Sequence, residues 1–205
     1  MESRGLCKGK IMTTTPHILA FGGSLRSDSF NQKIAALAAE GAREAGAEVT
    51  VIELRDYPLP VFDQDLEAAS GMPAEAKKLK ELFLKSNGLI IASPEYNSSL
   101  SAALKNAIDW ISRAESDDEP PIAALAGKTA LLLSASPGGL GGLRGLVHLR
   151  SILGNLGIIV LPDQIAIPTA HEVIKADGTL GDTKQSNKVK QLGTKLTNHL
   201  KKMLA

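Results

Sequence analysis

Short apolar segments with β-strand character alternate with segments of helical periodicity along almost the whole of this 205-residue chain. Each apolar segment is followed by apolar residues at the i, i+3, i+4 spacing of an amphipathic helix. The five apolar segments are 16–21, 48–53, 88–93, 129–134 and 158–161. Because consecutive parallel strands need a crossover of the kind that a helix provides, this alternation predicts an α/β fold. We expect a doubly wound, five-stranded parallel sheet with helices on both faces.

The chain has the length of one ordinary domain. We expect residues 16–205 to form this domain and residues 1–15 to be a disordered N-terminal extension, in which Met12 is an alternative natural start. The acidic segment 116–121 is predicted to be a solvated turn.

Composition excludes several classes of protein. The formal net charge is +1, without the basic excess of proteins that bind nucleic acids or membrane surfaces. No apolar segment approaches the roughly 20 residues that cross a bilayer, so no membrane association is predicted. The single cysteine, Cys7, cannot form an internal disulfide, which favours a reducing, cytoplasmic compartment. The four histidines have no metal-ligand spacing, and no metal site is predicted.

The first predicted strand ends in a loop, residues 21–31, that is rich in groups able to bind an anion. The loop opens onto a helix whose N-terminus has unpaired N–H groups and roughly half a positive charge, which favours a phosphate. Hydroxyl, amide and guanidinium groups add further donors of the kind that a phosphate dianion accepts. These donors are Ser24, Arg26, Ser27, Ser29 and Asn31.

Plainer interpretations of this loop stay open at the level of the sequence. Ser29 or Asn31 could act only as an N-cap of the helix, and Gly22-Gly23 could be only a tight turn. The loop lacks the Gly-Lys-Ser/Thr ending of a P-loop and the Gly-x-Gly-x-x-Gly pattern of a dinucleotide-binding Rossmann site. A nucleoside triphosphatase and a dinucleotide-binding Rossmann protein are therefore not the first choice.

Two further loops are expected at the same edge of the sheet. Residues 94–98 follow the third strand, and residues 136–142 follow the fourth. In doubly wound folds ligands bind outside the carboxyl ends of the strands, where the strand order reverses, so these loops should converge with the first. The glycines of 136–142 let backbone N–H groups approach a flat ring closely, although a glycine cluster is also typical of an ordinary turn. Glu95 is a candidate general base, but a hydrogen-bonding or solvated role fits a single carboxylate better.

Three motifs resemble a known family in content and order. They are Gly23-Ser24-Leu25-Arg26-x-x-Ser29-x-Asn31, Pro94-Glu95-Tyr96-Asn97, and Leu104-Lys105-Asn106-Ala107-Ile108-Asp109-Trp110. Together they resemble the NADPH-dependent FMN reductase family, which includes chromate and quinone reductases of flavodoxin-like fold. The resemblance covers roughly residues 16–200 and implies a flavodoxin-like, FMN-binding domain with strand order 2-1-3-4-5.

The resemblance also implies where a tightly bound FMN would lie. The first loop would hold its phosphate, the second would lie along the isoalloxazine, and the third would border the other side of the ring. The implied cofactor-binding residues are Ser24, Arg26, Ser29 and Asn31 in the first loop, Pro94, Glu95, Tyr96, Asn97 and Ser98 in the second, and Ser136, Gly138 and Gly139 in the third. No catalytic side chain is expected, because hydride transfer takes place between the nicotinamide and flavin N5.

We therefore predict an FMN-dependent oxidoreductase that oxidises NADPH or NADH and passes electrons to flavin, quinone or chromate-type acceptors by a ping-pong mechanism. The resemblance implies a homodimer or homotetramer, with the long polar loops 54–71 and 162–182 at the partner contact. The alternatives are a flavodoxin-like electron carrier and a flavin-binding regulator, neither of which would turn over a nicotinamide. Carriers of this type are generally acidic, so the near-neutral charge disfavours the first alternative.

Overall fold

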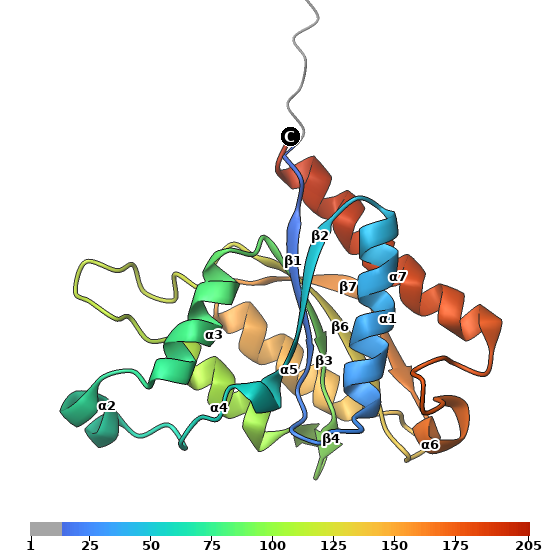
Figure 1. The fold of residues 1–205 in the computed structure, drawn as a ribbon, viewed down its shortest axis with the longest axis horizontal. Coiled ribbons are helices and arrows are strands. Elements are labelled where there is room, and N and C mark those ends of the chain that lie inside the picture. The colour runs from blue at the N-terminus through green and yellow to red at the C-terminus, as the bar shows by residue number, and fades with distance from the viewer. Residues whose placement is uncertain (1–13) are drawn as a thin grey trace, which may run out of the picture.

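A five-stranded parallel sheet lies at the centre of the computed structural model, which describes residues 14–205 (Figure 1). Its strand order is β2-β1-β3-β6-β7. The strands are β1 (His17–Gly22), β2 (Glu48–Glu53), β3 (Gly88–Ala92), β6 (Thr129–Ala135) and β7 (Ile159–Ile167). Counted along the sheet, this order is the predicted 2-1-3-4-5, so the flavodoxin-like architecture is confirmed. Of the predicted N-terminal extension, only Thr14 and Thr15 belong to the described residues.

Helices cover the sheet on both faces. One face carries α1 (Phe30–Glu44) and α7 (Thr183–Met203), and the other carries α3 (Ala74–Leu84), α4 (Ala102–Ile111) and α5 (Leu143–Asn155). The alternation of side chains along β1 explains this arrangement: its even-numbered apolar residues pack in the first core and its odd-numbered ones in the second. A strand buried on both sides needs apolar residues at every position, which is the continuous apolar run seen in the sequence.

The helices α1 and α7 cross at very close range. A Cβ added to Gly41 would lie 2.0 Å from the Lys190 carbonyl oxygen, and one added to Gly193 would lie 1.9 Å from the Ala38 carbonyl oxygen. The hydroxyl of Thr194 donates to the Gly41 carbonyl oxygen across the same contact, at 3.0 Å. Glycine is therefore required at both positions for the two backbones to touch.

The last strand is longer than predicted. We expected it to end at Leu161 and a polar loop to run from Pro162, but β7 continues to Ile167. This prediction was wrong because β7 is an edge strand, where proline is tolerated and one row of side chains is solvated. The pairing register with β6 shifts between Ala130 and Leu132, which accommodates the irregularity. A short helix, α6 (Ala170–Val173), follows the strand.

The long segment 54–71 also contains helices. It forms η1 (Leu54–Asp56) and α2 (Gln64–Ser70), and Figure 1 shows α2 projecting away from the sheet. The segment is fastened to α4 through the Pro60 carbonyl oxygen, which accepts hydrogen bonds from Asn106 Nδ2 and Trp110 Nε1 at 2.8 Å each. Trp110 is fully buried, as expected of an aromatic residue on the apolar side of a helix.

The acidic segment 116–121 was predicted to be a solvated turn. The structure differs from this prediction at Glu119. Glu119 pairs with Lys80 of α3, whose side chain is only 1% exposed. Lys80 Nζ lies 2.7 Å from both Glu119 Oε2 and the Arg113 carbonyl oxygen. A buried ammonium group needs such partners, so this segment is held to the body of the domain through one lysine.

Candidate active site at the carboxyl edge of the sheet

The three loops predicted to form a site meet around one small hollow at the carboxyl edge of the sheet. The hollow has a volume of about 50 Å³. Its lining residues come from all three loops: Ser24, Arg26, Ser29, Phe30, Asn31, Pro94, Glu95, Tyr96, Ala135, Ser136 and Pro137. Eight of the twelve predicted site residues belong to this set, and the other four are Asn97, Ser98, Gly138 and Gly139. The structure therefore brings together loops that are more than 100 positions apart in the sequence.

In the first loop the serines have local partners, whereas the arginine is available. Ser29 is the N-cap of α1 and accepts a hydrogen bond from the Gln32 N–H at 3.3 Å. Ser24 Oγ accepts from the Arg26 N–H at 3.2 Å. The Arg26 guanidinium lies 6.0 Å from the centre of the Phe30 ring, and no ion pair links it to a carboxylate within residues 14–205. An exposed cation at a helix N-terminus is suited to an anionic group.

Asn31 joins the first loop to the end of the fourth sheet strand. Its Nδ2 donates to the Ala135 carbonyl oxygen and its Oδ1 accepts from the Ala135 N–H, both at 2.9 Å. The side chain is buried, with 4% of the residue exposed. These two bonds fix the spacing of the two loops and use only one of the two amide hydrogens.

The second loop is a tight hairpin formed by β4 (Glu95–Tyr96) and β5 (Ser99–Leu100). The two turn residues, Asn97 and Ser98, have positive φ angles of 50° and 66°. Such a two-residue turn with both φ values positive is a type I′ turn, whose twist matches that of the strands. The turn leaves the Tyr96 side chain 52% exposed next to the hollow.

Glu95 faces the hollow but its carboxylate is directed to the N-terminus of α5. Oε2 accepts from the Arg144 and Gly145 N–H groups at 2.9 and 3.1 Å, and Oε1 accepts from Arg144 Nε at 2.8 Å and from its Nη2. Burial on its own raises the pKa of Glu95, but the hydrogen bonds and charge of Arg144 together with the Gly145 N–H outweigh it and lower the pKa. Glu95 is thus an ionised helix cap, which agrees with the predicted hydrogen-bonding role and not with a general base.

The glycines of the third loop fall into two kinds. Gly141 and Gly142 have φ angles of 60° and 90°, and a Cβ at Gly142 would lie 1.9 Å from Ser134 Oγ. At these two positions the backbone conformation and the neighbouring atoms of the chain already require glycine. By contrast, among the residues that the structure describes, a Cβ at Gly139 would have no atom within 4 Å, and one at Gly138 would meet only Ser136 Oγ at 3.7 Å. The backbone at Gly138 and Gly139 is therefore open to a flat group, and FMN fits this surface together with the donors of the first loop.

Two contacts of the site were not found from the sequence. Gln32 accepts from the Gly22 N–H at 2.7 Å and donates to the Ile52 carbonyl oxygen at 2.9 Å, so it joins the ends of β1 and β2. Ser101, the N-cap of α4, donates to the Gly23 carbonyl oxygen. The N-cap position of Ser101 is a signal that could have been read, whereas nothing in the sequence marks Gln32.

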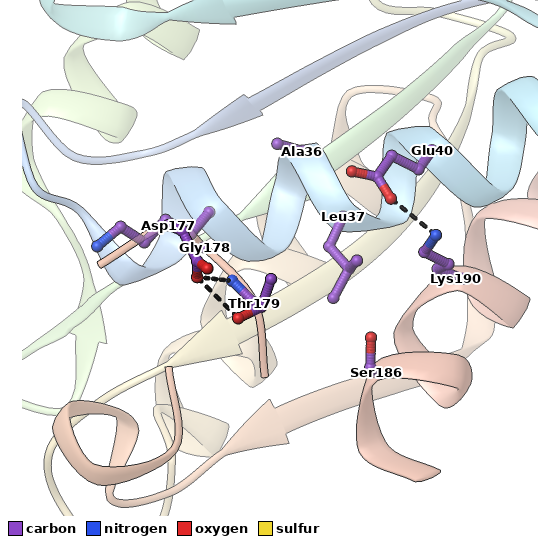
Figure 2. Close-up of a pocket in the computed structure, with 9 residues that line it drawn as sticks. Ala36, Leu37, Glu40, Asp177, Gly178, Thr179, Ser186 and Lys190 are labelled. Atoms are coloured by element: carbon purple, nitrogen blue, oxygen red, sulfur yellow. Dashed lines mark hydrogen bonds and ion pairs between the residues drawn. The ribbon is translucent and has the colours of Figure 1, made fainter. Parts of the chain in front are cut away.

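A larger cavity, of about 290 Å³, lies between α1, the turn at Asp177–Thr179 and α7 (Figure 2). Its charged groups already have partners, among them Asp28 for Lys33. Lys190 Nζ lies 2.8 Å from Glu40 Oε2, and Asp177 accepts from the N–H and hydroxyl of Thr179. None of the residues predicted for the site lines this cavity, so it is not a candidate for the cofactor.

A parallel sheet whose carboxyl edge carries three such loops defines a flavodoxin-like α/β protein with a site for a phosphate-bearing, planar ligand. The sequence profile of the NADPH-dependent FMN reductase family matches residues 16–172, and the chain belongs to this family. It is therefore an oxidoreductase, and the family implies FMN and NADPH or NADH as cofactor and co-substrate. The predicted family, enzyme class and cofactors are confirmed.

Individual relatives agree with this assignment. The chain is 38% identical over 151 residues to the quinone reductase of Escherichia coli strain K12, covering 73% of this chain and 76% of that protein. It is 34% identical over 175 residues to an NAD(P)H-dependent FMN reductase of Pseudomonas aeruginosa, covering 85% and 89%. Among solved structures, the flavoenzyme NAD(P)H:(acceptor) oxidoreductase FerB of Paracoccus denitrificans superimposes with a TM-score of 0.75 at 26% identity, covering 92% of this chain and 98% of that one.

Proposed function

We propose that this enzyme takes a hydride from NADPH or NADH and passes the electrons to a flavin, a quinone or a chromate-type oxyanion by a ping-pong mechanism. The convergence of the three loops on one hollow carries the proposal. The redox chemistry itself is supplied by FMN when bound, which accepts two electrons and later donates them. An acid or base side chain is not needed for that transfer, which fits the role of Glu95 as a helix cap.

The chain's own residues would bind and orient the cofactor. Arg26, with the hydroxyls of Ser24 and Ser29 and the N-terminus of α1, would hold the phosphate. Asn31 would complete the phosphate site with its remaining amide hydrogen and would keep this loop at a fixed distance from the third loop. These assignments rest on donor chemistry and on proximity within one hollow.

The two remaining loops would lie against the ring. The second loop would contribute Pro94, Glu95, Tyr96, Asn97 and Ser98, and the third would contribute Ser136, Gly138 and Gly139. The exposed Tyr96 and the open backbone at Gly138 and Gly139 support contacts to a planar group. The ping-pong proposal is based on the use of one face of bound FMN first by NADPH or NADH and then by the electron acceptor.

We also propose that residues 16–205 act as a single FMN-binding domain in a cytoplasmic homodimer or homotetramer. Val61 supports the partner contact, because it is 82% exposed on the long segment 54–71. A single cysteine, Cys7, agrees with a reducing compartment. No helix within residues 14–205 is long and apolar enough to cross a membrane.

Steady-state kinetics test the reaction type. Initial rates of NADPH oxidation, measured at several fixed concentrations of a soluble quinone, should give parallel double-reciprocal lines. Intersecting lines would contradict the ping-pong mechanism. No turnover with free flavin, quinone or chromate would contradict the reductase assignment and would favour an electron carrier or a regulator.

A further inference from the structure

Glu95 connects the hollow to the N-terminus of α5. Its side chain is 7% exposed, whereas that of its partner Arg144 is 56% exposed. The carboxylate accepts four hydrogen bonds, all from Arg144 and Gly145. The N–H groups and the positive end of α5 are therefore used by a protein carboxylate and not left for a ligand.

The hairpin that carries Glu95 is held to α5 at a second point. His148 Nδ1 lies 3.0 Å from Ser99 Oγ, and a Cβ at Gly145 would lie 3.2 Å from the Ser99 carbonyl oxygen. This second contact lets the hairpin stay in place when one charge of the Glu95–Arg144 pair is removed. A neutral variant should then change the electrostatics of the hollow more than its shape.

Apart from Arg26, which lines the hollow without an ion pair among residues 14–205, the charges near the hollow largely offset one another. Arg144 and the N-terminus of α5 are positive, and Glu95 opposes both. A hydride from NADPH carries two electrons and one proton, so its transfer leaves one additional negative charge on the cofactor and releases NADP⁺. Any unbalanced positive charge nearby would favour the reduced form, and any unbalanced negative charge would disfavour it.

We propose that Glu95 and Arg144 act as positioning residues that set the reduction potential of bound FMN through their charge balance at the N-terminus of α5. This inference rests on the proposed function. Glu95 lowers the potential by neutralising Arg144 and the helix end, and Arg144 raises it by neutralising Glu95.

The test is the midpoint potential of the FMN-loaded enzyme, measured anaerobically against a reference dye, with the dissociation constant of oxidised FMN measured beside it. Glu95→Gln should raise the preference for reduced over oxidised FMN on the order of tenfold, which is about 30 mV for a two-electron couple. Arg144→Gln should shift the potential in the opposite direction by a similar amount. The double variant should return close to the parent.

A matched control is the Glu67–Arg113 pair, which joins α2 to the end of α4 at 2.8 Å and does not line the hollow. Glu67→Gln and Arg113→Gln should leave the potential unchanged. Shifts of Glu95→Gln and Arg144→Gln in the same direction, or no shift in either, would overturn the inference, since a purely structural role predicts only weaker FMN binding. If Glu95→Gln does not fold, the direction in which Arg144→Gln shifts the midpoint potential tests the inference: a lower potential supports it, and a higher or unchanged potential overturns it. Failure of the parent protein to bind FMN would instead overturn the proposed function.

Discussion

The side-chain amide of Asn31 forms two hydrogen bonds with the backbone of Ala135, which lies 104 residues further along the chain. One bond satisfies the Ala135 carbonyl oxygen and the other satisfies its N–H, each at 2.9 Å. Asn31 lies in the first turn of α1, which begins at Phe30, and Ala135 ends β6. This pairing therefore fixes the distance between the first and third loops of the site, which we propose hold the phosphate and border the ring of FMN.

Asn31→Ala should destabilise the fold even without cofactor. The substitution leaves a buried N–H and a buried carbonyl oxygen of Ala135 without partners, which costs about 3 kcal/mol in total. The measurement is the free energy of urea unfolding of the FMN-free protein. An unchanged unfolding free energy would show that water or another side chain replaces the amide.

Arg26→Ala should weaken FMN binding without changing the stability of the FMN-free protein. The guanidinium is exposed and has no carboxylate partner within the described residues, so the stability of the FMN-free protein should stay the same. FMN binding should weaken by about 1.5–3 kcal/mol, the range for a hydrogen bond to a charged group. Fluorescence titration with FMN measures this loss, and Arg55→Ala, outside the hollow, is the control. If Arg26→Ala holds FMN as tightly as the parent, Arg26 is not the phosphate ligand.

The sheet could be predicted from the sequence because its central strands are buried on both faces. Every residue of β3 and β6 is buried, so β3 appears as an unbroken apolar run and β6 as an apolar run flanked by Thr129 and Ser134. The second half of β7 was missed because an edge strand mixes polar and apolar residues and here contains Pro162. The β4–β5 hairpin was missed because two-residue strands leave no periodic signal.

The convergence of the three loops could be predicted from the sequence, but the hydrogen bonds that join them to other elements could not. Donor-rich loops at the ends of parallel strands predict convergence, and the hollow contains residues of all three loops. The pairing of Glu95 with Arg144 spans 49 positions and depends on where α5 begins, which no local pattern encodes. The bonds of Asn31 to Ala135 were likewise not found from the sequence, because the two residues lie 104 positions apart.

The Lys80–Glu119 pair should make stability depend on pH. Hydrogen bonds from Lys80 and from the Glu115 N–H hold the pKa of Glu119 below its ordinary value of 4.5. Because the folded-state pKa is the lower one, the stabilisation is complete above the unfolded-state pKa and is lost as the pH falls through the folded-state pKa. Glu119→Gln, which leaves the buried ammonium with only the more distant carboxylate of Glu115, at 3.6 Å, should cost about 2 kcal/mol at pH 7.

This prediction is checked by urea unfolding of the parent and of Glu119→Gln at pH 7 and pH 4. The gap between the two proteins should narrow at the lower pH. Glu95 also has a lowered pKa, so the parent should lose further stability in the same range for an independent reason. A gap that does not change with pH would contradict the account of Glu119.

Gly193→Ala should destabilise the contact between α1 and α7. The new methyl group would overlap the Ala38 carbonyl oxygen, and separating two packed helices costs about 3 kcal/mol. Gly154→Ala is the matched control, because this helical glycine of α5 has no atom within 4 Å of the added Cβ. It should be neutral or stabilise by about 0.5 kcal/mol. Thermal unfolding of both variants tests the difference, and equal midpoints would contradict it.

The most direct test of the central claim is anaerobic mixing of the FMN-loaded protein with NADPH while the yellow flavin absorbance is followed, and then addition of a quinone. We predict that the protein binds one FMN per chain, that NADPH bleaches it rapidly, and that the quinone restores the colour. Failure to bind added FMN, or bound FMN that stays oxidised for minutes with NADPH, would contradict the assignment of the three-loop hollow as the active site of a reductase.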